Sequence, residues 1–256
     1  MSTMRITSLL YILSMIFASP AFSDNLVKDA IEILSRPDGT VRKWEKNLEV
    51  AVIGEPDFVV SVDEKLRQLA GVTNLEITVF PLVHSVSNFI SDGNLSARSA
   101  PGGGGRSVEF QLGETRRVFD VLIVSGTRAE VSSAALALSP SNASMQFAMM
   151  LARRDIICHF ESLSRSEGIF MSLIFVPTDQ EPSVVEACIH TELIQSMGLA
   201  NALERETLFS FGSDENVTSS TKKNDLDLLK ALYSVFRSGD RASSVADVFH
   251  SITNAD

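Results

Sequence analysis

The chain has 256 residues, 45% of them hydrophobic and 21% charged, with 22 Lys and Arg against 32 Asp and Glu. This length and composition fit one folded domain of ordinary size and exclude a disordered chain, and two cysteines exclude a disulfide-dense miniprotein. The formal net charge of −10 argues against nucleic acid and against an anionic membrane surface as partners, because both recruit clustered Lys and Arg.

The first 23 residues have the three parts of a secretory signal peptide. Arg5 supplies the positive charge, residues 6–18 form an apolar run, and Ala21-Phe22-Ser23 places small residues before a cleavage site. A membrane-spanning helix needs roughly 20 apolar residues, so an uncleaved anchor is the less favoured alternative. Cleavage would leave residues 24–256 with 21 basic and 32 acidic residues, a charge of −11. We therefore expect a secreted, periplasmic protein with no membrane association once the signal is removed.

Two cysteines, Cys158 and Cys188, lie 30 positions apart. In an oxidising compartment such a pair predicts a structural disulfide, which would contribute on the order of 3 kcal/mol. The alternative is a reactive thiol that uses His159 as its partner. Adjacent residues on a strand point to opposite faces, and this disfavours a catalytic pair of Cys158 and His159.

Hydrophobic periodicity predicts alternating helices and strands in the first third of the chain. We expect a helix over 25–34, a strand over 48–53, a helix over 59–69 that ends at Gly71, and a strand over 75–82. This strand–helix–strand order indicates a βαβ-like or split α+β opening.

A glycine-rich segment at 101–105 follows, within the polar stretch 91–107. A phosphate-binding loop needs a following Lys-Ser or Lys-Thr, which is absent, so we expect a hairpin tip or a flap. The remaining pattern predicts strands over 108–112, 118–124, 156–160 and 169–176, and one or two helices over 129–153 that are interrupted at Ser139-Pro140.

Ser183 and Glu186 form a capping-box pattern, which predicts a helix from about Val184 to Met197 with Gly198 as its terminator.

This helix has the frame of the zinc-protease pattern H-E-x-x-H-x-x-G-x-x-H, with Glu192 at the general-base position and Gly198 at the glycine. The three metal-ligand positions hold Thr191, Gln195 and Asn201, which are poor zinc ligands. We therefore expect no metal and no cofactor at this position.

The four histidines, His84, His159, His190 and His250, include no pair at metal-ligand spacing. His190 lies one residue out of the zinc frame, about 100° around the helix, and cannot replace a ligand.

Asp225 and Asp227 are predicted to open a helix that ends at Tyr233, where acids suit the helix dipole.

Several blocks of the sequence form a recognisable set: Val41-Arg-Lys-Trp44, Cys188, Glu192, Gln195, Gly198-Leu-Ala-Asn201, Phe209-Ser-Phe211, Asn224-Asp225-Leu-Asp227 to Tyr233, and Gly239. With these blocks the chain resembles a family of secreted bacterial proteins catalogued as domain of unknown function 2927, over residues 41–239. The chain departs from the family pattern at Thr191, where the family usually has a glutamate, and at Ala202, where an acid is frequent. The resemblance implies a zincin-like α+β fold of unassigned function and a structural pairing of the two cysteines.

Together these features predict a single α+β domain over 24–256. We expect a zincin-like mixed sheet, a long helix that carries Glu192, and a C-terminal helical segment.

Two interpretations of Glu192 stay open at this point. In the first, a Glu with a raised pKa and the Gln195 amide activate water and polarise a carbonyl without metal. In the second, Glu192 and Gln195 are structural and hold backbone groups of the 209–214 loop against the helix.

The favoured function is non-catalytic: a degenerate zinc-protease-like core whose cleft, including Thr191, Gly198 and Asn201, binds a peptide or an envelope protein. The alternative is a metal-independent hydrolase that acts on a peptide or cell-envelope substrate through Glu192 and Gln195. A purely structural envelope component is a third class.

Overall fold

The computed structural model of the chain describes residues 20–82, 86, 95–99, 106–112, 115–138, 142–153, 157–199, 201–203, 205, 207–210 and 218–253. Most of the predicted signal peptide therefore lies outside the described residues, as do His84, the glycine-rich segment 101–105, and Ser139-Pro140.

A five-stranded mixed sheet forms the centre of the molecule, in the order β2-β1-β6-β8-β7. Four of its strands run parallel, and β7 pairs antiparallel with β8 at one edge. The strands span Leu48–Ile53 (β1), Ile77–Leu82 (β2), Val121–Gly126 (β6), His159–Arg165 (β7) and Gly168–Pro177 (β8).

The predicted strand–helix–strand opening is confirmed. β1 and β2 are parallel neighbours, and the helix α2 (Pro56–Thr73) makes the crossover that parallel strands require. This helix continues two residues past the predicted end at Gly71. It ends where Asn74 adopts a left-handed conformation with φ 57° and donates its N–H to the carbonyl of Ala70 at 3.0 Å.

The predicted strand over 118–124 is wrong, because two strands that belong to different sheets occupy this segment. β5 (Thr115–Phe119) joins β3 (Leu95–Ser99) and β4 (Arg106–Leu112) in a three-stranded antiparallel sheet, whereas β6 begins at Val121 in the main sheet.

Asp120 separates these two strands. Its N–H donates to the Glu49 carbonyl at 2.9 Å, and its carboxylate accepts from the Glu49 N–H at 3.0 Å. Lys46 pairs with the other carboxylate oxygen at 2.5 Å. The apolar pattern therefore continues through a point at which the chain changes sheets.

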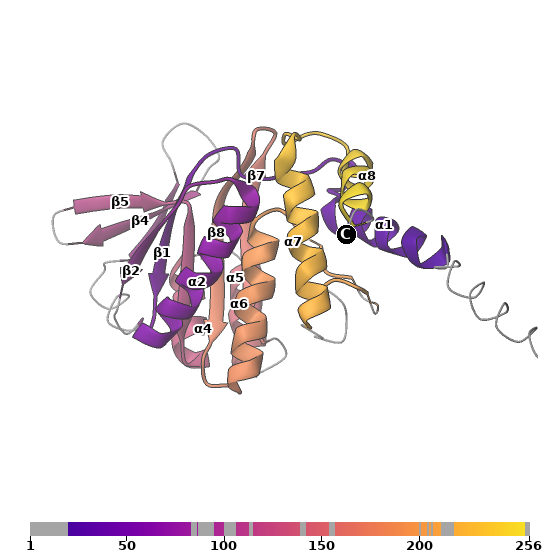
Figure 1. Cartoon of the computed structure of the whole chain (residues 1–256). Helices are drawn as coiled ribbons and strands as arrows, with labels where there is room; N and C mark the ends of the chain where they lie inside the picture. The colour runs from indigo at the N-terminus through magenta and orange to yellow at the C-terminus, as the bar shows by residue number, and fades with distance from the viewer. Residues whose placement is uncertain are drawn as a thin grey trace, which may run out of the picture.

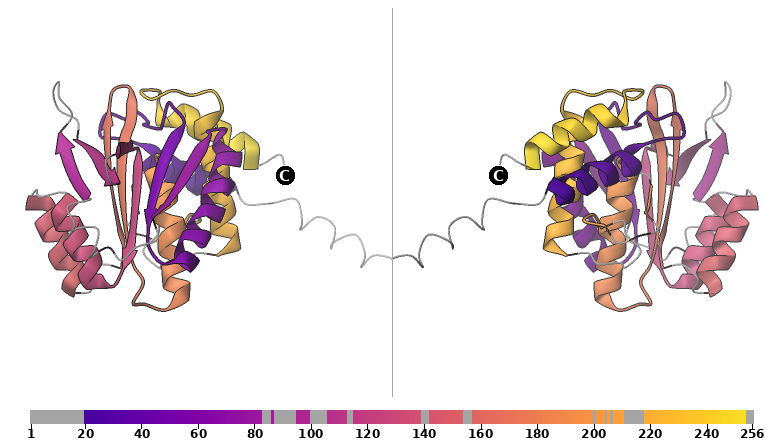
Figure 2. Two further views of the ribbon diagram at one scale, coloured as in Figure 1. Left: turned by 90° about the vertical axis from the view of Figure 1, so that its left-hand side faces the viewer. Right: turned by 90° about the vertical axis from the view of Figure 1, so that its right-hand side faces the viewer.

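Helices cover both faces of the main sheet (Figures 1 and 2). On one face, Val50 and Val52 pack with α2, α6 (Pro182–Ser196) and α7 (Ser219–Ser234). On the other face, Ala51 and Ile53 pack with α4 (Arg128–Leu138) and with the buried Leu151 of α5 (Asn142–Arg153). Burial on both faces explains why the last four residues of β1, Val50 to Ile53, are all apolar rather than alternating with polar ones.

The predicted helical region over 129–153 consists of two helices, α4 (Arg128–Leu138) and α5 (Asn142–Arg153). At the opposite end of the molecule, α1 (Pro20–Leu34) packs against α8 (Ala242–Thr253), and both contribute to the core cluster of α2 and α6 (Figure 1). The C-terminal helical segment is thus α7 and α8.

The chain folds as a mixed α and β protein, as predicted. Among the described residues, no helix combines the length and the apolar character that crossing a membrane requires.

Candidate functional site

The helix α6 carries the candidate site residues, but the predicted capping box at its start is wrong. Its N-cap is Glu181, which makes no side-chain capping bond, and Pro182 occupies the first turn. Proline supplies a helical φ and has no N–H to satisfy, so the helix starts there without a cap. The side chain of Glu186 bonds to α7 instead, where its Oε1 accepts a hydrogen bond from Lys222 Nζ at 3.0 Å.

Gly198 terminates α6, as predicted, with φ at +121° and its N–H donating to the Gln195 carbonyl at 3.0 Å. A Cβ at this position would lie 2.4 Å from the carbonyl oxygen of Arg42. Only glycine suits both this conformation and this close approach of two backbone segments.

The carbonyls at the end of α6 are bound by side chains from distant parts of the chain. Trp44 Nε1 donates to the Ser196 carbonyl at 2.9 Å, and Tyr233 Oη donates to the Met197 carbonyl at 2.8 Å. The Trp44 N–H in turn donates to Tyr233 Oη at 3.1 Å. These bonds satisfy carbonyls that a helix end leaves without partners.

Glu192 is buried, with 7% of its surface exposed, and its Oε2 atom has no hydrogen-bond partner among the described residues. Burial raises the pKa of its carboxyl group to about 8, so the group is mostly protonated at neutral pH. Gln195 and Cys188 are buried on the same helix. Glu192 is therefore a neutral, partly unsatisfied group in the interior.

Thr191 and Asn201 occupy two of the metal-ligand positions in the zinc-protease frame. Thr191 is half-buried. Asn201 Nδ2 donates to the carbonyls of Glu32 at 2.8 Å and Ser35 at 2.6 Å, so this amide binds the end of α1. In the part of the chain that the structure describes, no group of three or more His, Cys, Asp and Glu residues is placed to hold a metal ion.

A buried pair that the sequence analysis missed links α6 to α7. His190 Nε2 lies 3.0 Å from Asp225 Oδ2, and the two side chains are 6% and 0% exposed. The carboxylate of Asp225 also accepts from the Ser210 N–H at 3.2 Å and from Ser210 Oγ at 2.5 Å. Ser210 bonds to the acid and not to the imidazole, so this trio lacks the nucleophile-to-base bond of a hydrolytic triad. It fixes the 207–210 segment to two helices.

Two sequence expectations change with this pair. Asp225 does not open its helix, because α7 begins at Ser219 and Thr218 caps it by accepting from the Thr221 N–H. The structural interpretation gave Glu192 and Gln195 the task of holding the 209–214 loop. In the described residues, the bonds from Ser210 go to Asp225 instead. Two features of the sequence could have indicated this pair. They are His190, which lies one residue out of the zinc frame, and the blocks around positions 210 and 225 on which the family resemblance was based.

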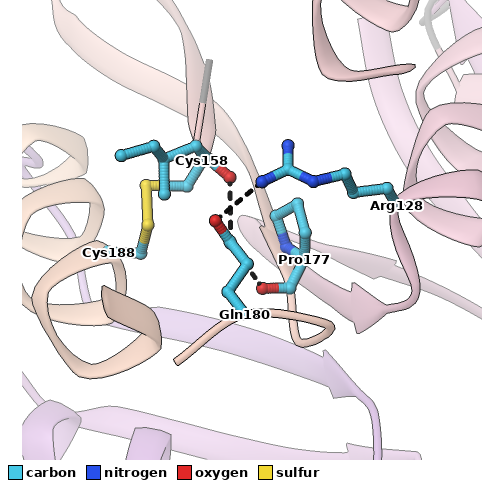
Figure 3. Close-up of a disulfide and its surroundings, with 6 residues drawn as sticks. Arg128, Cys158, Pro177, Gln180 and Cys188 are labelled. Carbon is cyan, nitrogen blue, oxygen red and sulfur yellow. Dashed lines mark hydrogen bonds between the residues drawn. A yellow bond between two sulfur atoms is a disulfide. The ribbon is translucent and has the colours of Figure 1, made fainter. Parts of the chain in front are cut away.

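The predicted disulfide between Cys158 and Cys188 is confirmed, with the Cα atoms 5.9 Å apart. It ties the start of the edge strand β7 to α6, and it removes the reactive-thiol alternative with His159. Figure 3 shows Gln180 beside the disulfide, where its Nε2 donates to the carbonyls of Ile157 at 3.3 Å and Pro177 at 2.9 Å. Arg128 donates to its Oε1 at 2.7 Å.

A groove of about 1030 Å³ runs between α2 and the N-terminal half of α6. Phe58, Pro182, Val185 and Ile189 contribute its apolar surface, and polar or charged side chains line the rest. The lining residues recur at helical spacing on the two helices, but the sequence analysis did not identify them, because only the fold brings the helices together. We refer to this feature below as the α2–α6 groove.

A smaller crevice of about 260 Å³ adjoins this groove at the carboxyl ends of the parallel strands. Gly54 follows β1, Ser125 and Gly126 are the last two residues of β6, and Thr178 follows β8. Phe58 and Thr178 line both hollows. Because the connection from β1 leads to β2 on one side while β6 lies on the other, the strand order reverses here. Open α/β sheets bind ligands at such a point.

The chain matches a family model described as "Protein of unknown function (DUF2927)" over residues 15–251. No curated protein and no solved structure matches it. The family match covers most of the chain and includes every block on which the resemblance was based. The chain therefore belongs to the DUF2927 family of proteins of unknown function.

Proposed function

We propose that this protein acts outside the cytoplasm as a non-catalytic binding protein that holds a peptide, or a peptide segment of another protein, in the α2–α6 groove. The observation that carries the proposal is the groove itself, which joins apolar surface to polar and charged walls. Ligand sites generally combine apolar lining, which supplies affinity, with a few polar groups, which fix orientation.

The size of the groove suits a peptide. Its α2 side runs from Asp57 to Gln68, which is 12 residues, and the distance between the two ends is roughly 17 Å along the helix. An extended peptide covers that length with about five residues. The apolar surface at Phe58, Val185 and Ile189 gives one or two side chains of such a peptide a place to be buried.

We also propose that the core descends from a zinc-protease-like ancestor and has lost its catalysis. The retained Glu192 and Gly198 support the common frame, and the loss of imidazoles at positions 191, 195 and 201 supports the loss of metal. The contacts of Asn201 also support the loss of metal, because its side-chain amide donates both of its hydrogen bonds among the described residues to carbonyls at the end of α1.

Location outside the cytoplasm is part of the proposal. Its supports are the disulfide, which is rare in reducing compartments, and the signal-peptide pattern of residues 1–23.

The test is selection from a random peptide library on the immobilised wild-type protein, followed by affinity measurement on the enriched peptides. Ser61→Trp fills the middle of the groove, and Gln68→Trp blocks its end from an exposed starting position. Val60→Trp is the matched control, since Val60 is 66% exposed on the same helix and does not line the groove. We expect enrichment on wild type and on Val60→Trp, and at least about tenfold weaker binding by both blocking variants. The absence of enriched peptides, or equal binding by all four proteins, would refute the proposal.

A metal-independent hydrolase is the second candidate, and one observation favours it. Glu192 holds a proton at neutral pH, as a general acid does, and one of its oxygens has no described partner. Digestion of a peptide library by wild type and by Glu192→Gln tests this candidate. Turnover that the substitution abolishes would establish it, and equal turnover or no turnover would remove it.

A further inference from the structure

We infer that the occupant of the α2–α6 groove is a charge-segregated peptide, with basic residues beside the N-terminal half of α2 and acidic residues beside α7. This inference rests on the proposed function and adds the chemistry of the ligand.

The α2–α6 groove continues into a second groove of about 500 Å³ between α2 and α7. Gln68 lines both, so one stripe of α2 borders the whole path. The stripe runs through Asp57, Ser61, Lys65, Gln68 and Val72, over 16 residues, and its two ends lie roughly 22 Å apart along the helix. Figure 1 shows α2, α6 and α7 side by side along this path.

The first part of the path is acidic. Three carboxylates, Asp57, Glu64 and Glu186, and one ammonium group, Lys65, line it. Lys65 and Lys222 approach Glu186 Oε1 at 3.5 and 3.0 Å, so that carboxylate is compensated. Asp57 and Glu64 are exposed and form no ion pair with another described residue. Asp57 leaves negative charge at the end of the groove nearest the start of α2, and Glu64 adds negative charge farther along the same helix.

The second part of the path is basic. Three ammonium groups, Lys222, Lys223 and Lys230, and one carboxylate, Asp227, line it. Lys222 bonds to Glu186, and Lys223 lies 3.7 Å from Asp227. Lys230 is exposed on α7 and adds positive charge at the far end.

The two charged ends act separately on a ligand. The stripe between them is roughly 22 Å long, whereas screening in physiological salt has a length of about 8 Å. A peptide of one charge sign would be attracted at one end and repelled at the other. A peptide with basic and acidic halves would match both ends, and its central apolar residues would contact Phe58 and Ile189. Charge complementarity of this kind sets partner choice and orientation.

The test uses the same random peptide library and three further proteins. Asp57→Lys with Glu64→Lys reverses the acidic end, and Lys223→Glu with Lys230→Glu reverses the basic end. A variant with Asp247→Lys and Lys28→Glu is the control, because it changes exposed charges on α8 and α1, away from both grooves. Circular dichroism and thermal unfolding of each variant establish that it is folded.

We expect peptides enriched on wild type to carry Lys and Arg in one half and Asp and Glu in the other. Each double reversal should weaken the binding of these peptides about tenfold. A peptide whose facing half carries the reversed charges should bind the variant with the original affinity. High salt should weaken binding to wild type and control alike. The inference would be overturned if the enriched peptides showed no charge segregation, or if both double reversals bound them as well as wild type does. Peptide binding itself would then still stand. A library that yields no enriched peptide would instead refute the proposed function.

Discussion

His190 of α6 and Asp225 of α7 form a buried pair, with His190 Nε2 3.0 Å from Asp225 Oδ2. The same carboxylate binds both the N–H and the hydroxyl of Ser210. One side chain therefore joins two helices and a loop, and all three of these bonds lie out of contact with water.

Removing this carboxylate should be strongly destabilising. Asp225→Ala leaves His190 and Ser210 without their acceptor, which costs about 3 to 5 kcal/mol of unfolding free energy. Asp247→Ala on the exposed face of α8 is the control and should change stability by no more than about 0.5 kcal/mol. Urea unfolding measures both. Equal stability of the two variants would contradict the role assigned to the pair.

The stability of the protein should depend on the protonation of Glu192. Burial raises its folded-state pKa from 4.5 to about 8, so the folded protein binds a proton that the unfolded chain releases above about pH 4.5. The stabilisation is complete below about pH 4.5 and is lost as the pH rises through about 8. Burial lowers the folded-state pKa of His159 from 6.5 to about 4, and this gives an opposite slope below about pH 6.5. The free energy of unfolding of wild type should therefore fall between about pH 6.5 and 8, and Glu192→Gln should remove that fall.

Thermal unfolding across this pH range checks the prediction. Glu186→Gln is the matched control, because Lys222 and Lys65 lower the pKa of Glu186 and keep it ionised over the whole range. It should keep the wild-type slope. A slope that survives in Glu192→Gln would show that another group is responsible.

Two glycines should respond in opposite directions to the same substitution. Gly198→Ala places a methyl group 2.4 Å from the Arg42 carbonyl in a backbone conformation with φ +121°, so we expect a loss of about 3 kcal/mol. Gly71→Ala lies in α2, where the new Cβ meets no atom within 4 Å apart from its chain neighbours and the nearby helix backbone, and it should gain up to about 1 kcal/mol. Chemical denaturation measures the free energy of unfolding of both variants. Unchanged stability in Gly198→Ala would contradict the close approach of the backbone at position 198 to the Arg42 carbonyl.

The disulfide between Cys158 and Cys188 should stabilise the fold. Replacing both cysteines by serine opens a cross-link over 30 residues, and we expect a loss on the order of 3 kcal/mol. Reductant should destabilise wild type by a similar amount and leave the double variant unchanged. Two free thiols in denatured protein from an oxidising compartment would show that the bond does not form.

The sequence predicted elements whose signal is local. The apolar patterns gave the strands β1 and β8 and the helix α2 to within a few residues. The capping pattern and Gly198 gave α6 to within two residues at each end. Local patterns failed where a competing local feature decided the outcome. Pro182 starts α6 in place of the Ser183 cap, and Asp120 divides one apolar run between two sheets.

The candidate site was less predictable, because its contacts join distant segments. His190 and Asp225 are 35 residues apart, and each alone is an ordinary helical residue. The α2–α6 groove combines residues near position 60 with residues near position 185. No spacing rule within one helix shows that the exposed faces of two helices will border the same hollow.

The most direct test of the central claim compares one library-selected peptide on three proteins by fluorescence anisotropy. These are wild type, Ser61→Trp in the groove, and Glu192→Gln in the buried zinc-like frame. The account predicts that Glu192→Gln binds the peptide as wild type does, and that Ser61→Trp binds at least about tenfold more weakly. Normal binding by Ser61→Trp together with loss of binding in Glu192→Gln would place the function at Glu192 and contradict the account.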